Sequence, residues 1–358
     1  MSSQSKATAP HSEQARSTNL YRLAIVGAAT LKGKEVAEVL NDRNFPSLDT
    51  KLLDDDESLG QLETMGDEIS FIQSVRSEQF DKVDFTFFAS DQESTHRNWK
   101  MVSNAGSAIV DLSGALEDKP GAVVRSPWIE RQLGLTIAPE LQPGPSVVAQ
   151  PAAVVLALLV LRLQKVGAIK RVAATVFEPA SEHGQKGMDE LHEQTVNLLS
   201  FQPLPKNIFD AQVAFNLITR YGEHSIPPLN SVEQRIVKHY QRIAGAGAPL
   251  PSLLLVQAPI FHGYAFAIHV EMNGVADVEQ VSQALAGDHV HIAQPAEDAP
   301  SNVSVAGQGD IQLSVKPDAA QPNSVWLWAA ADNLRIAATT AVECAETMAA
   351  SRPRGNIQ

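Results

Sequence analysis

The chain has 358 residues, of which 44% are hydrophobic and 19% charged, so it can bury a core and is long enough for two domains. Its 28 Lys and Arg residues against 41 Asp and Glu residues give a net charge of −13 without a basic run, which argues against nucleic acid and anionic membranes as partners. The single cysteine, Cys344, excludes an internal disulfide framework and fits the reducing cytoplasm. The polar residues 1–18 lack the apolar stretch of a signal peptide and are expected to form a disordered tail.

Residues 19–150 alternate between strand and helix patterns. The expected strands are residues 21–27, 51–53, 83–89, 108–112, 135–138 and the segment before Gln150, and the expected helices are residues 31–41 and 92–104. This alternation predicts an α/β domain with a doubly wound, Rossmann-like parallel sheet.

Residues 151–324 have a different pattern, and residues 325–358 add a strand and a helix. The expected strands are residues 169–178, 253–259, 264–272 and 325–330, the expected helices are residues 152–161, 184–199, 231–244 and 332–349, and residues 286–303 are expected to be a loop. In residues 264–272 large apolar side chains alternate with smaller or polar ones, which predicts a strand with one covered face. Residues 152–161 are too short a run for a membrane span, so we expect a core helix. These patterns predict an α+β domain.

The segment 147–154 predicts a strand, a turn and the start of a buried helix. A helix N-terminus stabilises a thiolate, so this layout would suit a nucleophilic cysteine. The turn contains Gln150-Pro151-Ala152-Ala153 and therefore offers no thiol.

The order of four motifs resembles the aspartate-semialdehyde dehydrogenase family, and in particular its Usg-type paralogue branch. These motifs are residues 111–117, 214–217, 257–263 and 332–335. The resemblance implies a nucleotide-binding Rossmann domain, a dimerisation and substrate domain, and a C-terminal strand and helix, residues 325–358, that pack on the first domain. It also implies an ancestral reaction, the NADP-dependent and phosphate-linked interconversion of aspartyl phosphate and aspartate semialdehyde.

The positions that match the family's catalytic groups have changed. The cysteine position is Ala153, which cannot form a thioester. The substrate-binding arginine position is Gln257, which lacks a bidentate cationic fork. The acid/base histidine position is Tyr264, whose side chain ordinarily titrates near pH 10. The resemblance therefore implies a pseudoenzyme.

Two further positions carry acids. Glu178 matches a glutamine of the family's active-site strand, and Glu117 matches an arginine that holds phosphate and is expected to repel it. A less altered pair is Glu233 and Arg235, which match a Glu-x-Lys motif and are candidates for binding an anionic small molecule; the alternative is an exposed helix face with mixed charges.

The dinucleotide loop is also altered. Its middle glycine is replaced by Thr30, whose side chain would stand where the backbone approaches pyrophosphate. Four acids at residues 54–57 favour NAD over NADP, because they would repel a 2′-phosphate; the alternative is an acidic surface turn. The candidate cofactor-binding residues are Gly27, Ala29, Thr30, Gly33, Asp54 and Asn333.

Three functions remain open from the sequence. The first is a catalytically inactive homodimer with a structural or regulatory role, which could also pair with a different protein such as an active enzyme. The second is an active NAD-dependent oxidoreductase in which Tyr264 and Glu178 form an acid/base pair. The third is a sensor of an anionic small molecule. No metal site is expected, because the histidines lack ligand spacing.

Overall fold

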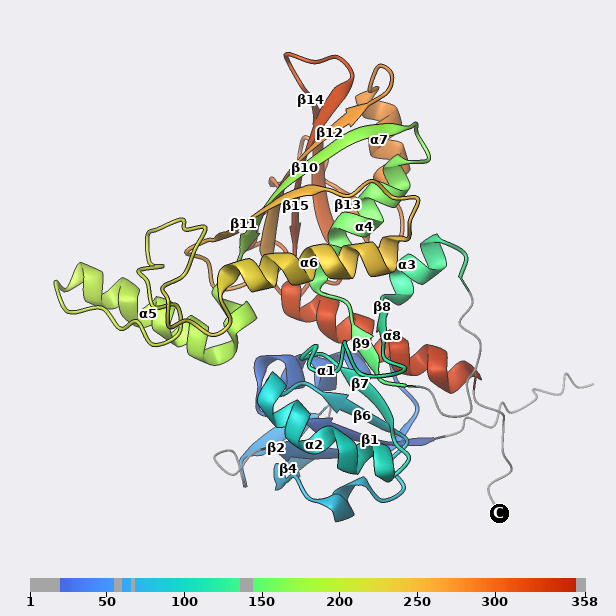
Figure 1. Ribbon diagram of the computed structural model, residues 1–358, viewed down its shortest axis with the longest axis vertical. Coiled ribbons are helices and arrows are strands. Elements are labelled where there is room, and N and C mark those ends of the chain that lie inside the picture. The colour runs from blue at the N-terminus through green and yellow to red at the C-terminus, as the bar shows by residue number, and fades with distance from the viewer. Residues whose placement is uncertain (1–19, 55–59, 66–67, 136–143, 352–358) are drawn as a thin grey trace, which may run out of the picture.

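The computed structural model describes residues 20–54, 60–65, 68–135 and 144–351, so the expected tail at residues 1–18 lies outside the described residues. The chain forms two lobes, each built on its own large sheet, with helices α6 (Leu229–Ala244) and α8 (Asn333–Ser351) running between them (Figure 1). None of the helices in the described ranges combines the length and apolar character needed to cross a membrane.

The first lobe is a seven-stranded parallel sheet, which confirms the Rossmann-like prediction. Its strands are β1 (Tyr21–Val26), β2 (Ser47–Asp54), β5 (Gln73–Ser74), β6 (Phe85–Phe88), β7 (Ala108–Asp111), β8 (Val123–Arg125) and β9 (Ser146–Val148). They lie in the order β5-β2-β1-β6-β7-β9-β8. The lobe also contains α1 (Leu31–Asp42), α2 (Gln92–Asn104), α3 (Pro127–Gln132) and the hairpin β3 (Leu62–Met65) with β4 (Glu68–Phe71). The strand expected at residues 135–138 falls almost entirely outside the described residues.

The second lobe is a six-stranded mixed sheet. Its strands are β10 (Ile169–Glu178), β11 (Ser252–Gln257), β12 (Tyr264–Met272), β13 (Val290–Ile292), β14 (Ile311–Pro317) and β15 (Ser324–Ala331), in the order β11-β10-β12-β15-β14-β13. Its apolar face shares one core with α4 (Pro151–Leu163), α6 and α7 (Val278–Leu285), while α5 (Gly184–Leu199) projects away from the body (Figure 1). From Phe266 to Met272 of β12 buried residues alternate with half-buried ones, as the sequence predicts, while Ala265 near the start of the strand is also buried.

Two expectations about this lobe are wrong. Residues 286–303 contain the short strand β13, which exists because it pairs with β14, an element the sequence pattern did not reveal. Residues 325–358 are not one unit on the first lobe, because β15 lies inside the second sheet between β12 and β14.

Helix α8 does return to the first lobe. It shares an apolar core with α1 that includes Cys344, which is fully buried. Burial raises the pKa of this thiol to about 12, so it is a packing residue and not a nucleophile. Polar contacts strengthen the pairing of the helices: Arg335 bonds to Glu35, Glu38 and Asp42 of α1.

Candidate functional site

The turn between β9 and α4 is closed by the side chain of Gln150. Its amide oxygen accepts hydrogen bonds from the backbone N–H groups of Ala152 at 2.6 Å and Ala153 at 3.3 Å, so it caps the helix that a thiolate would use. Its amide nitrogen donates to the hydroxyl of Tyr264 at 2.6 Å. Ala153 itself has no exposed surface. The structure therefore brings two of the altered positions together through Gln150.

Tyr264 is held in a state unsuited to proton exchange. Its side chain has no solvent exposure. Burial raises the pKa of Tyr264 well above its ordinary value of 10, and the nearby carboxyl groups of Glu182 and Glu178 raise it further. A hydroxyl with such a pKa keeps its proton at neutral pH and cannot act as a general base.

The side-chain amide of Gln257 is hydrogen-bonded to neighbouring groups of the protein and does not face an open cavity. Its amide nitrogen donates to the backbone carbonyls of Glu178 at 3.1 Å and Ala258 at 2.8 Å. Its amide oxygen accepts from the Tyr221 hydroxyl at 2.5 Å. Because Tyr221 gives its proton to Gln257, its oxygen is left to accept from His183 Nε2 at 2.9 Å. No sequence pattern pointed to Tyr221 or His183 as members of this site, because the network joins segments that are separate in the sequence.

Glu178 lies at the buried end of the same network. Its side chain has no exposure, and its carboxyl oxygen Oε1 lies 3.3 Å from the Tyr221 hydroxyl and 3.4 Å from His183 Nε2. The other carboxyl oxygen, Oε2, is buried and has no hydrogen-bond partner within the part of the chain that the structure describes. Burial raises the pKa of Glu178 above its ordinary value of 4.5, more than His183 lowers it. This carboxyl group therefore favours its neutral form.

Replacing Glu178 by glutamine is expected to change how stability depends on pH. The native state binds the Glu178 proton more tightly than the unfolded state does, so its contribution is full below pH 4.5 and is lost as the pH rises through the native pKa. Glu178→Gln cannot ionise, so this variant should unfold at a higher urea concentration than the wild type at pH 8 and at a similar one at pH 4. Glu193→Gln, on the exposed face of α5, is the control and should follow the wild type. A loss of stability in Glu178→Gln at pH 8 would contradict the reasoning.

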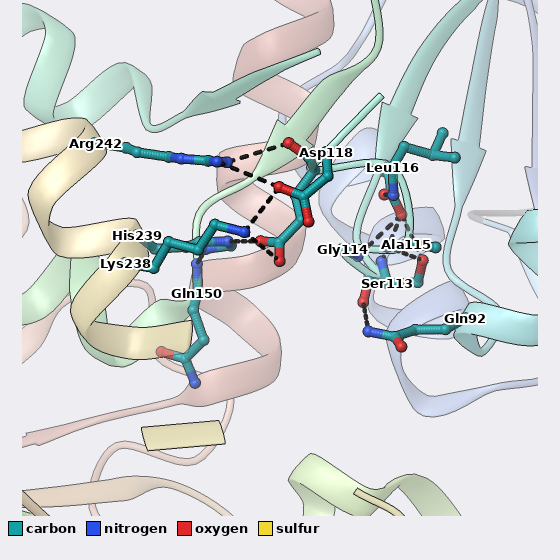
Figure 2. Close-up of polar contacts among 12 residues, drawn as sticks. Gln92, Ser113, Gly114, Ala115, Leu116, Asp118, Gln150, Lys238, His239 and Arg242 are labelled. Atoms are coloured by element: carbon teal, nitrogen blue, oxygen red, sulfur yellow. Dashed lines mark hydrogen bonds and ion pairs between the residues drawn. The ribbon is translucent and has the colours of Figure 1, made fainter. Parts of the chain in front are cut away.

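The sequence suggests that Glu117 presents an uncompensated negative charge. In the structure this carboxylate is instead paired with side chains of α6. It bonds to Lys238 Nζ at 3.0 Å and to His239 Nε2 at 2.6 Å, both from α6. Although burial opposes ionisation, these two hydrogen bonds lower the pKa of Glu117 to about 2. Lys238 and Arg242 also reach the neighbouring Asp118 (Figure 2). The acid at this position thus joins the two lobes.

The loop after β7 is shaped by the buried carboxylate of Asp111. One oxygen accepts from the N–H groups of Ser113 at 2.8 Å and Gly114 at 3.1 Å, and the other accepts from Leu116 at 2.9 Å. The Ser113 hydroxyl donates to the same carboxylate at 2.6 Å. Figure 2 shows this loop beside Gln92, whose side-chain amide donates to the carbonyl of Ser113. The loop's amides are therefore satisfied from within the chain.

The structure separates the two members of the candidate anion pair. The carboxylate of Glu233 accepts from the backbone N–H of Leu255 at 2.8 Å and so fixes α6 to β11. Arg235 lies over Gly114 so closely that a Cβ there would be 1.7 Å from Arg235 Nη2. The Nε atom of Arg235 is buried without a hydrogen-bond partner among the described residues. Of the two, only Arg235 keeps a donor for a ligand.

The dinucleotide loop keeps two glycines for packing reasons. Gly27 has a φ of +87°, and a Cβ there would lie 2.4 Å from the backbone nitrogen of Ser90. A Cβ on Gly33 would lie 2.1 Å from the carbonyl oxygen of Gly27. Both positions need glycine whether or not a nucleotide is bound.

The side chains of Thr30 and Asp54 hydrogen-bond to backbone amides of this loop. Thr30 caps α1 by accepting from the N–H of Gly33 at 3.0 Å, and its hydroxyl lies 2.8 Å from the carbonyl of Gly27. The carboxylate of Asp54 accepts from the N–H of Ala29 at 2.7 Å. These bonds use amides at the position where a Rossmann loop receives pyrophosphate. The other acids of the expected cluster, residues 55–57, lie outside the described residues.

The side chain of Asn333 hydrogen-bonds to residues of the second lobe. Its side-chain oxygen accepts from the Ser181 hydroxyl and from the Gly263 N–H, each at 3.2 Å, and its nitrogen donates to Glu182 at 2.9 Å. Asp332 caps α8 by accepting from the backbone N–H groups of Leu334 and Arg335.

The chain matches two family models over most of its length. The model for the semialdehyde dehydrogenase NAD binding domain matches residues 22–142, and the model for the semialdehyde dehydrogenase dimerisation domain matches residues 158–336. The division between the two models falls in the region of the Gln150 turn, where the lobes meet.

Relatives and solved structures agree with this match. An aspartate-semialdehyde dehydrogenase of Rickettsia bellii is 29% identical over 92% of this chain and 98% of its own. A USG-1 protein homolog of Pseudomonas aeruginosa is 30% identical over 87% of this chain and 93% of its own. The structure of a probable aspartate-semialdehyde dehydrogenase from Pseudomonas aeruginosa superimposes with a TM-score of 0.81 at 27% identity and covers 92% of this chain and 98% of that one. The matches cover both lobes, and the chain belongs to the semialdehyde dehydrogenase family.

Proposed function

We propose that this chain is a catalytically inactive member of the family and acts as a homodimer with a structural or regulatory role. The observation that carries this proposal is the network around Gln150, Gln257 and Tyr264, whose side chains are buried and bonded to their own neighbours. A substrate would have to displace these bonds before it met any reactive group. Leaving their partners unpaired would add a desolvation cost to each displacement.

The alternative of an oxidoreductase that uses Tyr264 and Glu178 gains no support from the geometry. Burial raises the pKa of both groups, and Tyr264, whose pKa lies well above 10, keeps its proton at neutral pH and offers no base. Each is also bonded inside the protein, and neither side chain has solvent exposure.

Restoring a thiol is expected not to restore the reaction. In Ala153→Cys the new side chain would stand near the N-terminus of α4, but Gln150 already caps that helix and the substrate clamp and proton shuttle remain absent. We expect no phosphate-dependent oxidation of aspartate semialdehyde above background by the wild type or by this variant, measured as NADPH or NADH absorbance. Circular dichroism provides the control for folding. Turnover by the unmodified protein would overturn the proposal, and turnover by Ala153→Cys alone would show that the other changes matter less than proposed.

For the nucleotide, we propose that any residual binding favours NAD over NADP and is weak. Asp54 and Thr30 take up amides of the loop, and the carboxylate of Asp54 would oppose a 2′-phosphate. Calorimetric titration with both nucleotides tests this. Tighter binding of NADP than of NAD would contradict it.

The open face of the second sheet is the proposed homodimer surface. The face opposite the helices carries Thr175, Ala267 and Trp328 side by side on β10, β12 and β15. Trp326 and Trp328 are each 38% exposed there, and the Trp328 ring lies 6.1 Å from that of Phe177. Half-exposed aromatic side chains around small ones are typical of a surface that another protein covers.

A second candidate function, sensing of an anion, is favoured by Arg235 alone. Its guanidinium lies beside Gly114, and its buried Nε has no hydrogen-bond partner in the described ranges of the chain. Titration with inorganic phosphate and with aspartate, followed by calorimetry, tests this candidate. Binding that Arg235→Gln abolishes and the exposed control Arg171→Gln retains would support it, while absence of binding would remove it.

A further inference from the structure

Two histidines of the second lobe contact the first lobe at separate places, and we call these contacts the seam. His239, on α6, bonds to Glu117 and to the backbone of Gln150. His289, in the turn before β13, stacks on Trp128 of α3 with ring centroids 3.9 Å apart and planes inclined by 4°. The proposed function uses neither histidine.

The hydrogen bonds of His239 require its neutral form. The backbone N–H of Gln150 lies 2.9 Å from His239 Nδ1, and a backbone N–H can only donate. Nδ1 must therefore accept, which means that the ring proton is on Nε2 and is donated to Glu117 at 2.6 Å. A second proton on Nδ1 would point at the N–H of Gln150 and break this contact.

The same argument applies to His289. The guanidinium of Arg131 on α3 lies 3.3 Å from His289 Nε2, and a guanidinium has no acceptor. Nε2 must therefore accept, and protonating it would place one cation against another. Arg131 is held in position by Glu343 of α8 at 2.9 Å.

The charged groups around each ring do not reverse this preference. His239 faces Glu117, which favours its cation, but also Arg235 and Arg242, which oppose it; burial is the largest influence and lowers the pKa of His239. His239 has no exposed surface, and Lys238 beside it already shares the charge of Glu117.

His289 faces cations and acids from several elements. Burial and then Arg131 lower the pKa of His289 to about 4, while Asp310 and Asp288 oppose this and Arg162 adds to it. Asp288 and Asp310 are exposed, so water screens their charges.

We propose that the seam is an acid-sensitive contact, in which protonation of His239 and His289 in mildly acidic solution loosens the first lobe from the second. Each ring binds its second proton more readily when the seam is open. The seam is therefore at full strength above pH 6.5, the ordinary histidine value, and weakens as the pH falls towards the native values. Two protons taken up on opening make the opening constant rise by up to about a hundredfold per pH unit.

The amide of Gln150 reports opening directly, because its hydrogen is the one that His239 accepts. Its hydrogen–deuterium exchange, corrected for the intrinsic rate, would be measured on the full chain from pH 7.5 to 5. We expect its protection to fall by about tenfold to a hundredfold per pH unit below pH 6.5. A change of less than about threefold over that range would overturn the proposal, since a single linked proton gives about tenfold per unit.

Replacing each histidine by a residue that does not titrate distinguishes the contributions of the two histidines to the pH dependence. His239→Asn keeps an acceptor near the Nδ1 position, and His289→Gln keeps one near the Nε2 position. In each single variant the pH dependence of the protection should lose the part that comes from one linked proton. In the double variant it should lose the parts that come from both protons. His96→Gln, which changes an exposed histidine of α2, should keep the wild-type profile. An unchanged slope in the double variant would also overturn the proposal, and the wild-type profile remains decisive if a variant does not fold.

Discussion

Asp111→Ala is expected to lower the free energy of unfolding by about 3–9 kcal/mol, because it leaves three buried N–H groups without acceptors at about 1–3 kcal/mol each. Those groups belong to Ser113, Gly114 and Leu116, and they lie 2.8–3.1 Å from the Asp111 carboxylate. Water cannot replace the lost acceptor readily, since Asp111 itself has no exposed surface. Urea unfolding at pH 7, followed by circular dichroism, measures the change.

Two variants control for the loss of side-chain volume and of charge. Asp111→Asn keeps one carbonyl oxygen for the loop and should lose less stability than Asp111→Ala. Asp49→Ala, at an exposed position on β2 of the same sheet, should leave the unfolding midpoint close to that of the wild type. Equal losses in Asp111→Ala and Asp49→Ala would show that the buried carboxylate does not organise the loop.

Ala267→Arg is expected to convert the proposed homodimer into a monomer. Ala267 pairs with Thr175 on one side and with Trp328 on the other, at the middle of the open sheet face. In a symmetric dimer the same patch meets itself, so the substitution would bury two unpaired guanidinium groups in one interface. An uncompensated buried charge costs about 3–5 kcal/mol, so one of the two groups alone would raise the dimer dissociation constant by about a thousandfold, and both together would raise it further.

Analytical ultracentrifugation at micromolar concentration measures this effect. Ser103→Arg, which adds the same charge to the exposed surface of α2, is the matched control and should sediment as the wild type does. A wild type that sediments as a monomer would refute the proposed dimer, and a dimeric Ala267→Arg variant would place the interface elsewhere.

Elements with a strong local pattern were predictable from sequence. The bounds of β10, α5 and β12 are those that the alternation of side chains and the helical spacing predicted. Elements that depend on a distant partner were not. β13 has three residues and, among the strands that the structure describes, pairs with β14 alone; the two lie on either side of a long segment without repeating pattern.

The sequence pointed to individual positions of the candidate site, but it did not predict which side chains contact one another there. The resemblance to the family predicts that Ala153, Gln257 and Tyr264 stand at the positions of a thiol, a guanidinium and an imidazole. It did not show that Gln150 bonds to Tyr264 or that Tyr221 bonds to Gln257, because these partners are separated by 114 and 36 residues. Glu117 was interpreted as a lone charge because its partners, Lys238 and His239, lie on a helix of the other lobe.

The sequence by itself determined which chemical groups are present, the alternation that builds each sheet, and the family to which the order of motifs points. Those properties are local, since side-chain identity and a periodicity of two or 3.6 residues are written along the chain. Only the tertiary structure decided what the remaining polar groups do. Hydrogen bonds over a few ångströms, formed between residues 89 to 122 positions apart in the sequence, make Gln150, Glu117 and His239 part of the contacts where the lobes meet.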